Sequence, residues 1–306
     1  MKKGKFRIGS STNAAYELKT TLESQLLYVS GLFSPPPKDL GDAIHEARQS
    51  YKKCRAILRL MRDAMGYASY YRENISLRDM QRELAQIRDA DVQHRLITRL
   101  SERYPEYGKK AWFKRMIEQA RKNYDLEEKH FFKIGRGAEI SCYTRSKAAQ
   151  LEQYALTGEG FELIEGGLSR IYRQGRDMGN LIFSQEADPC EIHAFRKKAK
   201  YLQYQLYYLQ TISRELFKGM SNTLKQLTEI LGYYNDLHIA CTKILTCAAE
   251  NKPPHKKQGL LVISLREEMQ KAKSDSKKIY EMLYLENPKQ FINRIAHYWE
   301  LHAFSD

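Results

Sequence analysis

Apolar residues along most of the chain recur every three or four positions, the spacing that places them on one face of an α-helix. Strict alternation of apolar and polar residues, which would indicate strands, is nearly absent. Proline clusters such as residues 35–37 and 253–254 interrupt the helical spacing, and proline ends or breaks helices. The pattern therefore predicts an all-α protein with helices near residues 11–33, 40–66, 74–102, 107–131, 138–156, 160–185, 189–217, 219–249, 256–286 and 288–304.

Two short motifs occur twice, in the same order. IHEAR at residues 44–48 returns as IHAFR at 192–196, and LAQIRDADV at 84–92 returns as LGYYNDLHI at 231–239. Motifs that recur at a nearly constant spacing indicate a duplicated unit. We therefore expect one domain, of two repeated bundles of about four helices each, related by a pseudo-two-fold axis and preceded by a basic arm. The expected limits are 11–304 for the domain, 11–157 and 158–304 for its repeats, and 1–10 for the arm.

Basic residues outnumber acidic ones, with 51 Lys and Arg against 37 Asp and Glu, so the formal net charge is +14. This charge attracts polyanions such as nucleic acid, an anionic membrane or polyphosphate. No stretch approaches the roughly 20 apolar residues that span a bilayer, and no apolar run follows the basic N-terminus as in a secretory signal. Five cysteines without a Cys-x-x-Cys disfavour a disulfide framework or a zinc cluster. We expect a cytoplasmic protein without membrane insertion.

The helix predicted near 40–66 carries cations along one face. Steps of three and four residues stack them, and Glu46 is the only carboxylate between residues 45 and 62. Like charges at this spacing repel, so a row of one sign is better explained by a missing anion than by solvation. The predicted binding residues here are His45, Arg48, Lys52, Lys53, Arg55, Arg59 and Arg62.

A second row begins at His193, at the repeat-related position, and no acidic residue occurs from 193 to 213. Either row alone could be a solvated helix face, but two related rows favour anion binding. The leading histidines could pack at a helix start, or donate hydrogen bonds to phosphate oxygens or a neighbouring helix and gain charge below about pH 6.5. The predicted binding residues here, including three arginines of the preceding helix, are Arg170, Arg173, Arg176, His193, Arg196, Lys197 and Lys200.

Polar residues of the second motif form a predicted supporting set, namely Arg88, Asp89, Asp91, Asn235 and Asp236. The carboxylates have two interpretations at this stage. They either hold arginines of the rows through ion pairs, or form helix-start and interhelical hydrogen bonds. Two carboxylates in RDAD are too few for a metal cage without other ligands, so we expect neither a metal nor a cofactor.

Together these residues resemble the conserved histidine α-helical domain (CHAD) family. His45-x-x-Arg48-x-x-x-Lys52-Lys53-x-Arg55 is similar to its first signature, and His193-x-x-Arg196-x-x-x-Lys200-x-x-Gln203-Tyr204 to its second. Arg88-Asp89-x-Asp91-Val92 and Leu231-Gly232-x-x-Asn235-Asp236 resemble the motifs that follow each signature. The resemblance covers nearly the whole chain and is to the stand-alone form.

The resemblance implies two helical bundles around a basic central groove or pore. It also implies that the protein binds inorganic polyphosphate and associates with polyphosphate granules. The chain departs from the family pattern at Gln203, where a basic residue is usual, and this puts the strength of the second half of the site in doubt.

Two other classes of function remain open alongside a non-catalytic polyphosphate-binding protein. A protein that binds single-stranded nucleic acid needs aromatic side chains among the cations, and only Tyr204 and Tyr207 lie near the second row. A metal-dependent helical phosphohydrolase would need more ligands than the single Glu127-x-x-His130 pair supplies.

Overall fold

The structure is a computed structural model that describes residues 6–250 and 256–303. Its described part contains helices and connecting turns but no strand, so the predicted all-α class is confirmed. The helices of the first half are α1 (Ala14–Leu32), α2 (Leu40–Leu60), α3 (Arg62–Met65), α4 (Tyr67–Glu83), α5 (Ala85–Arg103), α6 (Pro105–Gly108), α7 (Ala111–Lys133) and α8 (Arg136–Gln150), and a 3-10 turn, η1 (Leu151–Gln153), follows α8. Those of the second half are α9 (Glu162–Ser184), α10 (Pro189–Tyr208), α11 (Arg214–Glu250), α12 (Lys256–Leu283) and α13 (Pro288–Ala303), with η2 (Leu209–Thr211) after α10.

Several boundaries differ from those that the pattern predicts. The helix expected near 40–66 ends at Leu60, and the one expected near 74–102 starts earlier and is interrupted at Leu84. Gly66 separates α3 from α4 with a φ of 76°, a conformation that glycine adopts at little cost. The interruption at Leu84 has no glycine or proline to announce it, and this leucine is fully buried.

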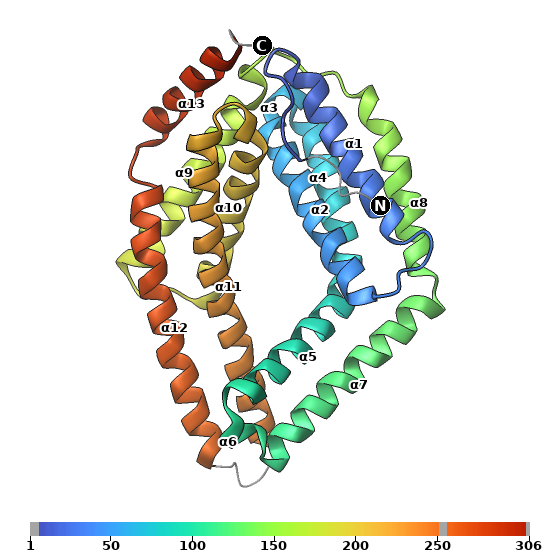
Figure 1. Cartoon of the computed structure of the whole chain (residues 1–306), viewed down its shortest axis with the longest axis vertical. Coiled ribbons are helices and arrows are strands. Elements are labelled where there is room, and N and C mark those ends of the chain that lie inside the picture. Colours follow the sequence, from blue (N-terminus) through green and yellow to red (C-terminus); the bar gives the residue numbers. More distant parts are fainter. Residues whose placement is uncertain (1–5, 251–255, 304–306) are drawn as a thin grey trace.

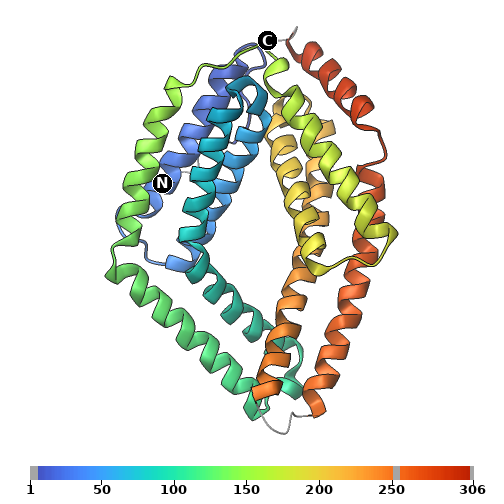
Figure 2. The same cartoon turned by 180° about the vertical axis from the view of Figure 1, so that it is seen from behind.

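The helices pack in a similar order in the first and second parts of the chain. In the first half α1 packs on α2 and α8, α2 on α4 and α5, and α5 on α7. In the second half α9 packs on α10 and α13, α10 on α11, and α11 on α12. Both views place α2 and α10 toward the middle of the molecule, with α7 and α8 along one outer edge and α12 along the other (Figures 1 and 2). A two-fold axis relating the halves stays a prediction.

The halves meet where α2 packs against α9 and α10, where α3 packs against α9 and where α5 contacts α11. Gly167 of α9 makes this approach possible, because a Cβ there would lie 2.1 Å from the carbonyl oxygen of Leu60. The Gln205 side-chain amide, buried on α10, donates to the carbonyl oxygen of Ala56 on α2 at 3.1 Å. These contacts fix α2 beside α10, and they therefore determine which of their faces come together.

Part of the predicted N-terminal arm belongs to the core. Phe6 and Ile8 are buried, the backbone N–H of Ile8 donates to the carbonyl oxygen of Tyr208, and the Thr211 hydroxyl donates to the carbonyl oxygen of Ile8. Residues 1–5 of the arm lie outside the described residues. None of the described helices combines the length and apolar character that a segment crossing a bilayer needs.

Candidate functional site

One face of helix α2 is apolar and packs against the core, and another face carries the cations of its row. Asp39 caps the helix, since its carboxylate accepts from the backbone N–H of Asp42 at 2.8 Å. The apolar face, with Ala47, Tyr51 and Cys54, is completely buried. Helix α10 is built in the same way, beginning with a capping box and a proline in its first turn. Burial of the apolar faces thereby aims both rows away from the core of each half.

Four cations from the two halves come together where α2 lies beside α10. We call Arg48, Lys52, Arg196 and Lys200 the central cluster. Burial lowers the pKa of Lys52 to about 8, and the neighbouring charges of the other three members act in the same direction. Burial and the charge of Arg196 also lower the pKa of Lys200 to about 8, although Glu229 acts in the opposite sense. Within the described part of the chain, no carboxylate forms an ion pair with any member.

The two arginines of the central cluster are held in equivalent ways. Arg48 Nη1 donates to the carbonyl oxygen of Gln81 at 2.6 Å, and Arg196 Nε donates to that of Thr228 at 3.0 Å. Gln81 and Thr228 occupy repeat-related positions, three residues before the paired second motifs. A main-chain carbonyl fixes each guanidinium group without neutralising its charge.

Asp89 and Asp236 lie close enough to the central arginines for their charges to interact. Burial raises the pKa of both carboxyls, and Arg48 opposes the shift at Asp89, as do Arg99 and Arg196 at Asp236. Among the described residues, no hydrogen bond joins either carboxylate to its arginine. They therefore act on the cluster through their charge, and neither forms, among the described residues, the ion pair with the row that was one of the two interpretations left open by the sequence.

His45 binds a neighbouring helix. Arg88 Nη2 of α5 lies 2.9 Å from His45 Nδ1, and since a guanidinium group can only donate, the histidine nitrogen accepts. The other end of Arg88 donates to Asp91 at 2.5 Å, and Asp91 also accepts from Arg95 at 2.6 Å. Burial and the charge of Arg88 lower the pKa of His45. Asp91 therefore orients arginines of its own helix rather than those of the α2 row.

His193 occupies the position in the second half that corresponds to His45, but among the described residues it has no arginine partner like Arg88. Burial lowers its pKa to about 4, with Lys197 and Arg196 acting in the same direction and a side-chain interaction with Asn235 acting against it. Asn235 stands at the position that corresponds to Arg88. His193 Nδ1 itself is buried without a hydrogen-bond partner among the described atoms. In the free protein, burial and the neighbouring cations therefore oppose the gain of charge that the ordinary pKa of a histidine would give below about pH 6.5.

The remaining cations of the α2 row have partners inside the protein. Arg55 donates to the side-chain oxygens of Asn74 and Gln81 at 3.1 and 2.8 Å. Arg59 stacks 3.9 Å above the ring of Tyr201 on α10, and Arg62 lies over Tyr67 and Tyr70 of α4. Sequence reasoning missed these tyrosines, since they come from other helices and follow no spacing shared with the row.

Other predicted binding residues lie apart from the central cluster. Lys53 lies over the ring of Phe6, and Arg170 forms an ion pair with Asp63 at 2.9 Å. Arg176 donates to the carbonyl oxygen of Tyr284, while Arg173 and Lys197 are exposed. Two of the three α9 arginines thus have partners inside the protein, and the prediction that these arginines extend the second row stays a prediction.

No three His, Cys, Asp or Glu side chains in the described ranges are grouped so that they could hold a metal ion. Glu127, of the Glu127-x-x-His130 pair, instead accepts a hydrogen bond from Gln86 at 2.8 Å.

The fold and the site define an all-helical protein in which cations from two parts of one chain come together without forming ion pairs to carboxylates of the described residues. A family model of the CHAD domain matches residues 37–244, well over half of the chain. The protein therefore belongs to the CHAD domain family. Among curated proteins no relative matches this sequence.

Proposed function

We propose that this protein binds inorganic polyphosphate at the central cluster and leaves the polymer intact. The observation that carries the proposal is the convergence of Arg48, Lys52, Arg196 and Lys200, none of which forms an ion pair with a carboxylate among the described residues. Polyphosphate offers about one negative charge per phosphate and no bases, so its recognition requires closely spaced cations. Arginine supplies bidentate contacts to phosphate oxygens, and lysine supplies a compact charge. The family is linked to polyphosphate, which agrees with this chemistry.

The two halves would then form pseudo-two-fold bundles on either side of a basic groove or pore. The matching contacts of Arg48 and Arg196 with repeat-related carbonyl groups support this arrangement. Arg88, held by His45 and Asp91, would extend the site along α5. A long polymer could contact both rows at once, and we place the protein in the cytoplasm and on polyphosphate granules.

Single-stranded nucleic acid is the competing polyanion, and the rings near the cluster argue against it. Arg59 covers the ring of Tyr201, and Lys200 lies 5.2 Å from the centre of the Tyr204 ring. A base would have to displace these cations before it could stack. Polyphosphate needs no such rearrangement.

Competition at fixed salt tests the proposal. Labelled long-chain polyphosphate is bound to the protein, and unlabelled polyphosphate or single-stranded RNA is added at equal phosphate concentration. We expect polyphosphate to compete more strongly, and stronger competition by RNA would contradict the proposal. A phosphate-release assay accompanies it, because turnover that Asp89→Ala abolishes would make the protein an enzyme.

A further inference from the structure

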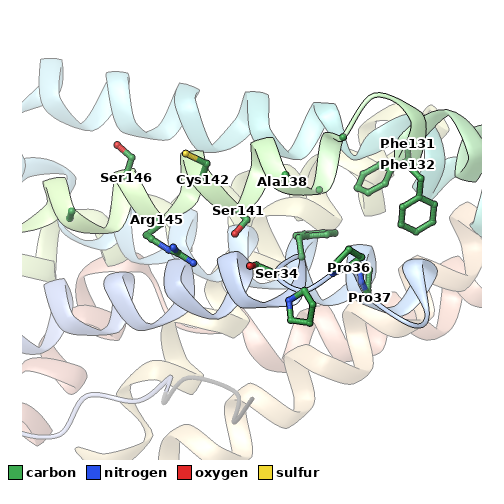
Figure 3. A pocket seen from close by; sticks show the side chains of 15 residues that line it. Ser34, Pro36, Pro37, Phe131, Phe132, Ala138, Ser141, Cys142, Arg145 and Ser146 are labelled. Carbon is green, nitrogen blue, oxygen red and sulfur yellow. The ribbon is translucent and has the colours of Figure 1, made fainter.

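A half-open groove of about 680 Å³ lies in the first half (Figure 3), and none of its lining residues belongs to the central cluster. It runs between the end of α1, the proline segment 35–37 and the corner where α7 turns into α8. Phe131 and Phe132 stand beside the prolines at one end (Figure 3). Its volume lies within the range of small-molecule sites, roughly 300–1,000 Å³.

The floor of the groove is fixed before any ligand binds. The Ser30 and Ser141 hydroxyls form a buried hydrogen bond of 3.0 Å that ties α1 to α8. Phe33 packs against Phe131 with ring centres 6.0 Å apart. Gly135 makes the turn between α7 and α8 with a left-handed φ of 66°. A preformed apolar wall of this kind loses little conformational entropy when a ligand binds.

The lining is apolar except for a few hydroxyls, one thiol and a single charged side chain, Arg145. Arg145 reaches from α8 toward α1 (Figure 3), and no carboxylate in the described part of the chain pairs with it. Phe132 keeps 47% of its surface exposed although the adjoining Phe131 is buried. An apolar trough with one free cation complements a molecule that has an apolar body and one negative charge.

We propose that this groove binds a long-chain carboxylate, with its alkyl chain along Phe132 and the prolines and its carboxylate on Arg145. The α8 side of the groove extends from Gly137 to Ala149, which at the rise of an α-helix is about 18 Å. This length accommodates an extended alkyl chain. The site is independent of polyphosphate binding and shares no residue with the central cluster.

Two cysteines make the test internally controlled. Cys142 lines the groove and Cys190 lies at the start of α10, and both are free and exposed. The full-length protein is treated with a thiol-alkylating reagent while tetradecanoate is titrated below its micelle concentration, and mass spectrometry follows each cysteine. We expect saturable slowing of alkylation at Cys142 and an unchanged rate at Cys190. Unchanged alkylation at Cys142, or equal slowing at both cysteines, would overturn the proposal.

Ligand charge and two variants separate the anionic contact from general apolar adhesion. Tetradecanol should protect Cys142 more weakly than the carboxylate, and tetradecylammonium least. Arg145→Gln should raise the Kd of tetradecanoate about tenfold, since it removes a charged hydrogen bond, and leave that of tetradecanol unchanged. Lys129→Gln removes an exposed charge outside the groove and should change the Kd by about twofold or less. Equal effects of the two substitutions, or protection by tetradecylammonium as strong as by the carboxylate, would reject a site built for an anion.

Phe132→Ala tests the apolar wall. It should weaken tetradecanoate and tetradecanol alike, with an unchanged helical circular dichroism spectrum as the check on folding. If Phe132→Ala left both affinities intact, the alkyl chain would not lie along Phe132 and the proposal would be overturned.

Discussion

The rows on α2 and α10 agree at some repeat-related positions and diverge at others. Arg48 and Arg196 bind equivalent main-chain carbonyl groups, and Lys52 and Lys200 share a pKa lowered to about 8. The positions that agree are those of the central cluster. The next position differs, with Arg55 in one half and Gln203 in the other.

The difference at this position involves two residues in each half, because the partner on the following helix differs as well. In the first half Arg55 donates to the side-chain oxygen of Gln81. In the second half Gln203, at the position corresponding to Arg55, accepts from the hydroxyl of Thr228, which corresponds to Gln81. Both pairs fasten the row helix to the helix that follows. Gln203 therefore keeps the contact between the two helices that Arg55 makes in the first half, so this position of the signature has a structural role.

The largest effect should come from reversing the two lysines of the cluster. Lys52→Glu combined with Lys200→Glu exchanges two cations for anions at the point where both halves meet. We expect polyphosphate affinity to fall by about 100-fold or more, at roughly tenfold for each lost charged contact before any added repulsion. Fluorescence polarisation with labelled polyphosphate at fixed salt measures the change.

Lys122→Glu combined with Lys129→Glu is the matched control, since it changes net charge equally on the exposed face of α7. Its affinity should fall only slightly. Equal losses in both double variants would mean that polyphosphate responds to the net charge of +14 and not to the cluster.

The next effect concerns pH. Lys52 and Lys200 titrate near pH 8 in the free protein, against an ordinary value of 10.5, because burial and like charges disfavour their protonated forms. A bound polyanion favours those forms, so binding above pH 8 should take up protons. Affinity should then fall by up to about tenfold per lysine for each pH unit above 8. Calorimetry in buffers of different ionisation enthalpy measures the uptake.

Folding should respond to pH in the opposite direction. Between about pH 8 and 10.5 the unfolded chain holds more protons on these lysines than the folded protein does, so a rise in pH favours the folded state. The wild type should therefore gain stability relative to Lys52→Gln combined with Lys200→Gln as pH rises from 7 to 9. For the binding prediction, a polyphosphate affinity that stays constant from pH 7 to 9 would show that the two lysines do not contact polyphosphate.

Periodicity and repeated motifs were sufficient to predict the helical class and the cations of the central cluster. These depend on local spacing, which the sequence states directly. Periodicity could not predict that Arg55 would donate a hydrogen bond to Gln81 or that Arg59 would stack on Tyr201, because those partners come from other helices. Nor could it reveal that Arg170 would form an ion pair with Asp63 across the junction between the halves.

A smaller effect tests whether the two halves contribute equally. Lys52→Gln and Lys200→Gln should each raise the Kd about tenfold. Each should also reduce the slope of log affinity against log salt by about 0.7, the value for one phosphate contact on a single strand. Lys52 has more cationic neighbours than Lys200 has, and Arg88 is one of them. A loss confined to Lys52→Gln would place the ligand on the first half alone and refute a shared site.

The smallest effect on binding should come from Arg55→Gln, which copies the residue of the second half into the first. Arg55 is part of the family signature, yet its guanidinium group already donates to Asn74 and Gln81. We therefore expect the Kd for polyphosphate to change by about threefold or less, while the free energy of unfolding falls by about 1–3 kcal/mol because the buried Gln81 and the half-buried Asn74 lose their donor. Urea denaturation and polarisation on the same preparation measure both quantities. Lys52→Gln is the contrasting variant, since it should lose affinity without losing stability. If Arg55→Gln instead lost as much affinity as Lys52→Gln and kept its stability, Arg55 would be a ligand-binding residue, and the absence of a cation at Gln203 would be a real weakness of the second half.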